Sequence, residues 1–126
     1  MSVECRIITG LTLEFARNLT HADFAKCHEF EDKHPELDEY KYDQDDRAGK
    51  LLIICDGMNG EFLRLVQTDF ICIGDLGPKN EFVELPAPNH VFDPKLLEKM
   101  NNLYKEYTGK LPDLHEYKYA MWSQWY

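Results

Sequence analysis

The sequence lacks any apolar run of about 18 residues, and its start lacks the basic and then apolar pattern of a secretory signal. Neither a membrane-spanning helix nor export is therefore predicted. Cysteine is also scarce. The four cysteines are Cys5, Cys27, Cys55 and Cys72, and none forms a Cys-x-x-Cys pair. Without an export signal, this pattern favours free thiols in a cytosolic protein over a disulfide framework.

Motifs for catalysis or cofactor binding are absent as well. The sequence has no Gly-x-Ser-x-Gly, no Gly-x-Gly-x-x-Gly and no Walker-type phosphate loop. The glycine-containing segment at residues 57–60 is too short to hold a phosphate and predicts a tight turn instead. We therefore assign no catalytic residue and no cofactor from the sequence.

The chain also lacks clustered basic residues. It has 14 lysines and arginines against 23 aspartates and glutamates, a formal net charge of −9. Direct binding to nucleic acid is disfavoured, because phosphate contacts require clustered Lys or Arg. The negative charge is concentrated in residues 29–46, where nine acidic and two basic residues give a net −7.

This acidic segment has two interpretations. It can attract a basic protein partner, with carboxylates standing in for phosphates if that partner binds nucleic acid. Alternatively, the acids only keep the protein soluble. The aromatic C-terminus is a second binding feature if one face of its strand is uncovered, because large aromatics dominate interface hot spots. The candidate partner-binding residues are Asp38, Glu39, Asp43, Asp45, Asp46, Trp122, Trp125 and Tyr126.

The length fits a single domain, residues 1–126, of the α+β class. Residues 21–33 follow a helix capping box, and residues 94–108 lie between an Asp-Pro helix start and a terminal glycine. We predict these two helices packed against a mainly antiparallel sheet of about five to seven strands. The predicted strands are residues 3–9, 35–42, 50–56, 61–67, 70–74, 81–85 and 112–126, with 70–74 either separate or continuing residues 61–67 across a bulge.

An imperfect internal repeat joins residues 35–42 to residues 112–119, with six of eight positions identical. Each copy follows a predicted helix, so the repeat indicates a shared way of packing. We expect Leu37 and Leu114 to fill the core and the tyrosines of each copy to face the preceding helix. A strand is preferred for both copies because Tyr and Trp favour pleated surfaces, although a helix from residue 112 fits a stripe of apolar residues.

The first helix carries the best metal candidates. These are His21, Cys27, His28, Glu31 and the nearby His34, all of types that zinc accepts. Their spacing matches no established metal pattern, and Cys27 also fits the apolar helix face. Surface histidines and a core thiol are the simpler interpretation, so no metal is assigned.

Three functional hypotheses follow. The first is a binding or inhibitory protein that acts through protein–protein contacts on a basic partner; small bacterial immunity proteins and phage-encoded inhibitors share this general profile, but no family motif is matched. The second is a small enzyme or ligand-binding domain with a pocket near His90 and His115. The third is an oligomeric structural component in which strand edges pair between copies. Monomer and homodimer both stay open.

Overall fold

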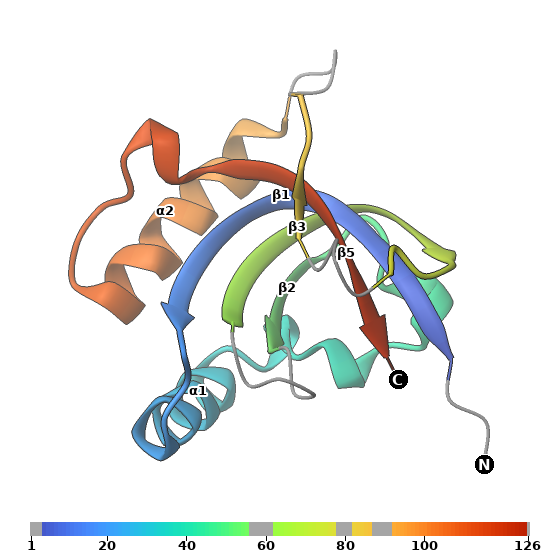
Figure 1. Ribbon diagram of the computed structural model, residues 1–126. Helices are drawn as coiled ribbons and strands as arrows, with labels where there is room; N and C mark the ends of the chain where they lie inside the picture. The colour runs from blue at the N-terminus through green and yellow to red at the C-terminus, as the bar shows by residue number, and fades with distance from the viewer. Residues whose placement is uncertain (1–3, 56–61, 78–81, 87–91, 126) are drawn as a thin grey trace.

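The computed structural model describes residues 4–55, 62–77, 82–86 and 92–125, with residue 125 described by its backbone alone. Within these residues it has two α-helices and one sheet of five antiparallel strands in the order β2-β3-β1-β5-β4 (Figure 1). The helices are α1 (His21–Lys33) and α2 (Pro94–Thr108), and the strands are β1 (Cys5–Arg17), β2 (Leu51–Cys55), β3 (Phe62–Ile73), β4 (Val83–Glu84) and β5 (Lys118–Trp125). The α+β class and both helices are confirmed.

Local capping accounts for both helices. At α1, Thr20 Oγ1 accepts the N–H of Asp23, and the Asp23 carboxylate accepts the N–H of Thr20 at 2.8 Å. At α2, the Asp93 carboxylate accepts the N–H of Lys95 at 2.9 Å. Gly109 ends α2 in the left-handed conformation, with φ 84°, which costs glycine little.

The central strand, β1, is longer than the predicted residues 3–9. The predicted strand stops before Gly10, but β1 continues through this residue, and its register with β3 shifts between Thr9 and Gly10. A Cβ at this position would lie 2.4 Å from the carbonyl oxygen of Gln67, so glycine allows two backbones to approach closely. On β3 the extra residue at this bulge is Asp69. Residues 62–73 therefore form one continuous strand, which confirms the prediction that residues 70–74 continue residues 61–67 across a bulge.

The main hydrophobic core lies between one face of the sheet and both helices. Phe15 of β1 stands near its centre. Its ring stacks on Tyr107 of α2 with centroids 4.8 Å apart and meets Phe30 of α1 edge-on at 5.7 Å. Neighbouring strand residues point to opposite faces, and a second, smaller core covers the other side. That second core consists of Ile8, Leu52, Ile54, Val66 and Trp122.

The strand predicted for residues 35–42, the first repeat copy, is wrong. The chain forms three short 3-10 turns: η1 (Pro35–Leu37), η2 (Glu39–Lys41) and η3 (Gln44–Asp46). The Asp38 carboxylate accepts a hydrogen bond from the backbone N–H of Tyr40 at 3.0 Å. In a strand this N–H would bond to a neighbouring strand, so the side chain of Asp38 stabilises the turn instead. Asp38 forms an isolated bridge with Ile53 of β2, which is a single pairing and not a strand.

The second copy begins with a similar turn, η4 (Leu114–Glu116), and then enters β5. The strand is therefore confirmed for Lys118–Trp125, which do not form a helix. Shared packing of the two copies is wrong at the leucines, because Leu37 is fully buried whereas Leu114 is 91% exposed. Tyr117 and Tyr119 pack against the main core, as predicted for the second copy, but the same prediction is wrong for the first copy, where Tyr40 is 74% exposed and Tyr42 packs against the second core.

Candidate functional site

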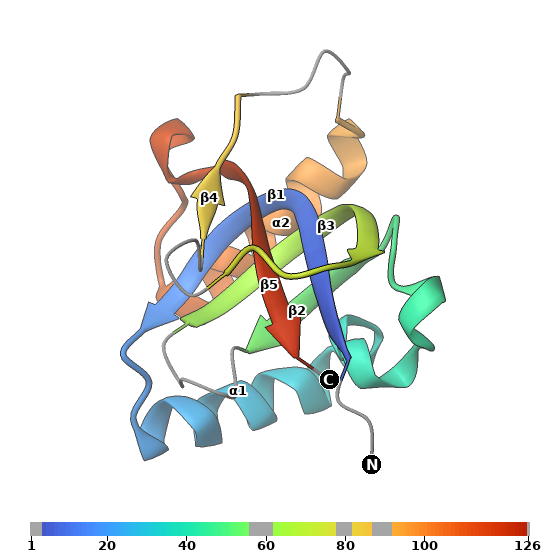
Figure 2. The ribbon, with the colours of Figure 1, turned by 45° about the vertical axis from the view of Figure 1, so that its right-hand side comes forward.

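The acidic segment runs from α1 through η3, along the lower side of the molecule in Figure 2. Six of its nine acids are exposed and form what we call the acidic surface: Glu29, Asp32, Glu36, Asp43, Asp45 and Asp46. Glu36 pairs with Lys99 at 3.4 Å, and Asp45 pairs with Arg6 at 3.5 Å. The other four form no ion pair with any residue in the described part of the chain. Their charge is directed at solvent.

Glu39 is not part of this surface, which corrects its prediction as a partner-binding residue. It is 2% exposed and lies against Arg47 and Gln124, which are buried too. Its Oε2 is 3.6 Å from Arg47 Nη1, and Gln124 Nε2 donates to its Oε1 at 3.1 Å. Burial raises the pKa of the Glu39 carboxyl to about 7, although Arg47 opposes the shift. Glu39 therefore fastens the turns of the acidic segment to β5.

Tyr40 is a further exposed residue of this segment, and it was not among the partner-binding residues predicted from the sequence. It is 74% exposed, and the Arg47 guanidinium lies 5.6 Å from its ring centroid. Asp38, a predicted partner-binding residue, is half-buried and holds the turn that presents Tyr40. The sequence did offer one signal for this turn. Asp38 lies two residues ahead of Tyr40, and aspartate often caps a turn by accepting a hydrogen bond from the backbone two residues on.

Trp122 is buried, which corrects its prediction as a contact for a partner. It is 3% exposed, and its ring stacks on Phe82 at 6.1 Å between centroids. The guanidinium of Arg64 lies 5.5 Å from its ring. The second core thus covers the sheet face that would have to be open for Trp122 to contact a partner. The side chain of Trp125 and the whole of Tyr126 lie outside the described residues.

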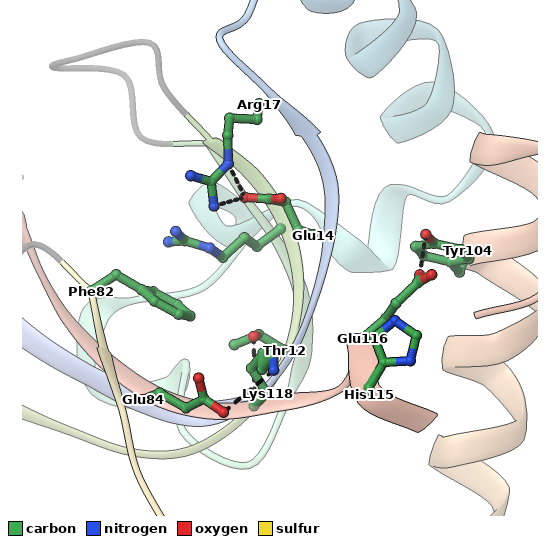
Figure 3. A pocket seen from close by; sticks show the side chains of 10 residues that line it. Thr12, Glu14, Arg17, Phe82, Glu84, Tyr104, His115, Glu116 and Lys118 are labelled. Atoms are coloured by element: carbon green, nitrogen blue, oxygen red, sulfur yellow. Dashed lines mark hydrogen bonds and ion pairs between the residues drawn. The ribbon is translucent and has the colours of Figure 1, made fainter. Parts of the chain in front are cut away.

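A pocket of about 510 Å³ opens beside the start of β5 (Figure 3). β5 stops pairing with β1 at Lys118, opposite Thr12, whereas β1 continues to Arg17 alongside β3 alone. Side chains of α2 and η4 close the space left beside this free edge. The lining residues, which define the β1–β5 pocket, are Thr12, Glu14, Arg17, Arg64, Phe82, Glu84, Tyr104, His115, Glu116 and Lys118.

His115 was predicted beside a pocket and does line one, while His90 lies outside the described residues. The sequence did not reveal the other lining residues. One signal was Arg64, a charged residue in the middle of an apolar strand and only 4% exposed. Its guanidinium lies over the rings of Phe62 and Phe82, 3.8 and 3.9 Å from their centroids. The alternation of polar and apolar residues on β1 was a second, weaker signal.

The carboxylates of the pocket all have partners. Glu14 pairs with Arg17 at 2.8 Å, and Glu84 pairs with Lys118 at 3.4 Å. Glu116 accepts a hydrogen bond from the Tyr104 hydroxyl, and this bond lowers the pKa of the Glu116 carboxyl. Burial and the same bond raise the pKa of Tyr104 to about 12. Tyr104 is therefore a hydrogen-bond donor at neutral pH, not a base.

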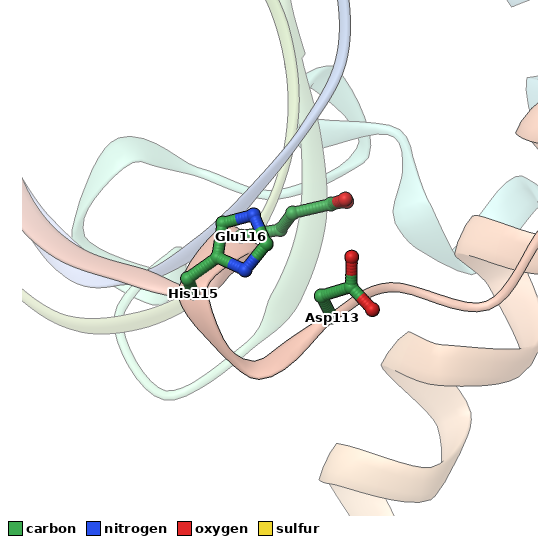
Figure 4. A group of neighbouring side chains, drawn as sticks. All are labelled: Asp113, His115 and Glu116. Carbon is green, nitrogen blue, oxygen red and sulfur yellow. The ribbon is translucent and has the colours of Figure 1, made fainter.

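One group of potential metal ligands gathers at the edge of this pocket. The ligand atoms of Asp113, His115 and Glu116 lie within 4.8 Å of one another (Figure 4). Oxygen and imidazole donors suit zinc. Asp113 and His115 are exposed, however, and Glu116 also accepts from Tyr104 and pairs with Lys110 at 3.8 Å. These competing partners leave two exposed ligands, which is a weak basis for a metal site.

The metal candidates of α1 do not gather into a site among the residues that the structure describes. The Cys27 thiol donates to Glu31 at 3.2 Å, and burial raises the pKa of that thiol, so it stays protonated. His34 turns instead to Glu106 of α2, 2.5 Å from its Nε2. His34, the residue that follows α1, therefore links this helix to α2.

Comparison with models of protein families, with curated proteins and with solved structures finds no match for this chain. Neither helix in the described part of the chain is both long enough and apolar enough to cross a membrane. The functional proposals below therefore rest on the geometry of the acidic surface and of the β1–β5 pocket.

Proposed function

We propose that the chain is a small cytosolic binding or inhibitory protein that docks on a basic protein partner through the acidic surface. The observation that carries this proposal is the set of four exposed carboxylates without an ion pair among the described residues: Glu29, Asp32, Asp43 and Asp46. Two exposed lysines, Lys33 and Lys41, are the only bases of the segment, so its field is strongly negative. Such a field steers a basic partner and suppresses acidic ones.

The way the segment is fastened supports a docking role. Leu37 fills the main core, and Glu39 reaches Gln124 of β5, so two buried side chains hold the turns that carry the carboxylates. A surface held in one conformation loses less entropy on binding than a flexible acidic loop. Acids needed only for solubility require no such attachment.

Tyr40 gives this surface an apolar contact. Exposed charge pairs contribute only about 0–1 kcal/mol each, so steering alone does not make a tight complex. A tyrosine ring that is 74% exposed adds contact area at low entropic cost. We assign Tyr40 as the contact that a partner buries among the carboxylates.

Affinity capture with matched variants tests the proposal. Wild-type protein, Asp43→Asn/Asp46→Asn and Glu98→Gln/Asp113→Asn are each used to capture proteins from lysate of the native host. Both variants lose two negative charges, but Glu98 and Asp113 are exposed acids outside the acidic surface. We expect one basic protein to be retained by the wild type and the Glu98/Asp113 control, and lost from Asp43→Asn/Asp46→Asn.

High salt should release the same protein, because exposed charges are screened over about 8 Å at physiological ionic strength. The proposal is wrong if the captured proteins are the same for all three baits. It is also wrong if capture survives high salt unchanged.

A further inference from the structure

The β1–β5 pocket is a second site, separate from the acidic surface. Its volume of about 510 Å³ lies within the range of small-molecule pockets, about 300–1,000 Å³. It is built from β1, β3, β4, β5, α2 and η4, none of which belongs to the acidic segment. Its β1 wall is preformed, because Thr12, Glu14 and Arg17 are all paired with β3, and Thr12 is paired with β5 as well.

Charge inside this pocket is balanced. Among the described lining residues, three carboxylates stand against three basic side chains, in a protein whose net charge is −9. The Glu14–Arg17 and Glu84–Lys118 pairs face each other across the opening in Figure 3. A charged ligand is attracted by one member of each pair and repelled by the other, so the pocket favours neither sign of charge, whereas an uncharged ligand leaves both pairs undisturbed.

The paired groups still have hydrogen-bonding capacity. An ionised carboxylate has about four lone-pair sites, an ammonium three donors and a guanidinium five. The Glu14–Arg17 pair uses two guanidinium N–H groups on one oxygen, and the Glu84–Lys118 contact uses one oxygen of Glu84. An occupant with several hydroxyl groups can both donate to these oxygens and accept from these nitrogens.

An aromatic wall completes the recognition surface. Phe82 lines the pocket. Its ring stacks on Trp122 of the second core, and the Arg64 guanidinium lies over it, so both neighbours hold the ring in place. Tyr104 lines the opposite side, where its hydroxyl is held by Glu116. Braced rings offer a flat apolar surface that loses little freedom when a ligand packs against them.

We propose that the β1–β5 pocket binds an uncharged, hydroxyl-rich ring, that is, a sugar of one or two units. Its hydroxyl groups meet the two ion pairs at the opening, and its apolar ring face packs on the aromatic wall. The proposal requires no chemical step. It is independent of the acidic surface, so either proposal can fail while the other holds.

Titration with defined sugars tests this site. Amide chemical shifts of the wild-type protein are followed while glucose, galactose, mannose, N-acetylglucosamine and their disaccharides are added, with glucuronate and glucosamine as charged analogues. We expect at least one neutral sugar to move the amide signals of Thr12, Glu14, Glu84 and Lys118 with a millimolar dissociation constant. Binding should change little with salt, and both charged analogues should bind more weakly.

Two ion-pair deletions provide matched variants. Glu84→Gln/Lys118→Gln removes a pair of the pocket. Glu36→Gln/Lys99→Gln removes a pair of the same 3.4 Å length whose residues do not line the pocket, and neither variant changes the net charge. We expect the first to weaken sugar binding about five- to tenfold, the effect of about one lost hydrogen bond, and the second to leave it unchanged.

Phe82→Leu keeps an apolar side chain at the wall but removes the ring, so it tests the packing contribution separately. We expect it to weaken binding while the amide spectrum remains that of a folded protein. The proposal is overturned if no neutral sugar moves these signals at about 100 mM, a level at which even weak small ligands bind. It is equally overturned if a charged analogue binds more tightly, or if the pocket variants bind as the wild type does.

Discussion

At the scale of single residues, buried charge decides which acids of the segment are available to a partner. Glu39 and Asp38 are neighbours, yet Glu39 is buried in a network with Arg47 whereas the Asp38 carboxylate holds a turn. Their types and order in the sequence did not distinguish these roles. The distinction depends on Gln124, which is 85 positions away in the chain and meets Glu39 only in the folded protein.

The Glu39 carboxyl gives a testable pH dependence. Its pKa rises from an ordinary 4.5 to about 7 in the folded protein, mainly through burial. The folded state therefore holds this proton more tightly than the unfolded state. Its contribution to the free energy of unfolding is fully present below pH 4.5 and is lost as pH rises through about 7. The full change is about 3 kcal/mol, from about 1.4 kcal/mol per unit of pKa.

Urea denaturation between pH 4.5 and 8 measures this contribution in the wild type and in Glu39→Gln. The variant has no titrating group at this position, so its stability should fall less over the range, whatever the offset between the two curves. Asp43→Asn, an exposed acid of the same segment, serves as control and should follow the wild type. Parallel curves for all three proteins would show that Glu39 ionises normally.

At the scale of elements, local signals were sufficient for the helices and insufficient for the repeat. Both helices carry their capping residues in the sequence itself, so their limits were predicted correctly. The Glu-Tyr-Lys-Tyr segment occurs in both repeat copies. In the first copy Glu39–Lys41 form a 3-10 turn, whereas the second copy enters β5 at Lys118. Pairing decides between them: Lys118 meets Thr12 of β1, a contact 106 positions away in the chain.

The bulge between β1 and β3 requires glycine at position 10, because the backbone of β3 lies too close for a side chain. Gly10→Ala places a Cβ 2.4 Å from the backbone oxygen of Gln67, which cannot rotate away. We expect it to lower the free energy of unfolding by about 2–4 kcal/mol, since overpacking and a displaced strand pair both contribute. Thermal or urea unfolding of the purified variant measures the loss.

Gly74→Ala is the matched control for this bulge. Its added Cβ would lie 2.9 Å from Ile7 Cδ1, the end of a flexible side chain that can move aside. The loss for Gly74→Ala should therefore be less than half of that for Gly10→Ala. Equal losses would mean that the close approach at the bulge is not what requires glycine there.

At the scale of the whole molecule, the acidic surface and the β1–β5 pocket belong to different elements. The acidic surface extends over α1 and the turns η1 to η3, while the charge-balanced pocket is built by the sheet, α2 and η4. The sequence predicted the first feature because the acids are contiguous. Of the pocket it predicted only His115, because the other walls come from four strands and a helix that lie far apart in the chain. Burial of Trp122 was missed for the same reason, since Phe82 covers it.

The most direct test of the central claim is binding of a short arginine-rich peptide, measured by titration calorimetry at about 50 and 300 mM salt. The proteins compared are the wild type, Asp43→Asn/Asp46→Asn and Glu98→Gln/Asp113→Asn. If the acidic surface is the docking site, the first variant binds about tenfold more weakly at low salt, from two exposed charge contacts, and the second binds as the wild type does. Equal weakening in both variants would contradict the account, because the peptide would then be responding to total charge and not to this surface.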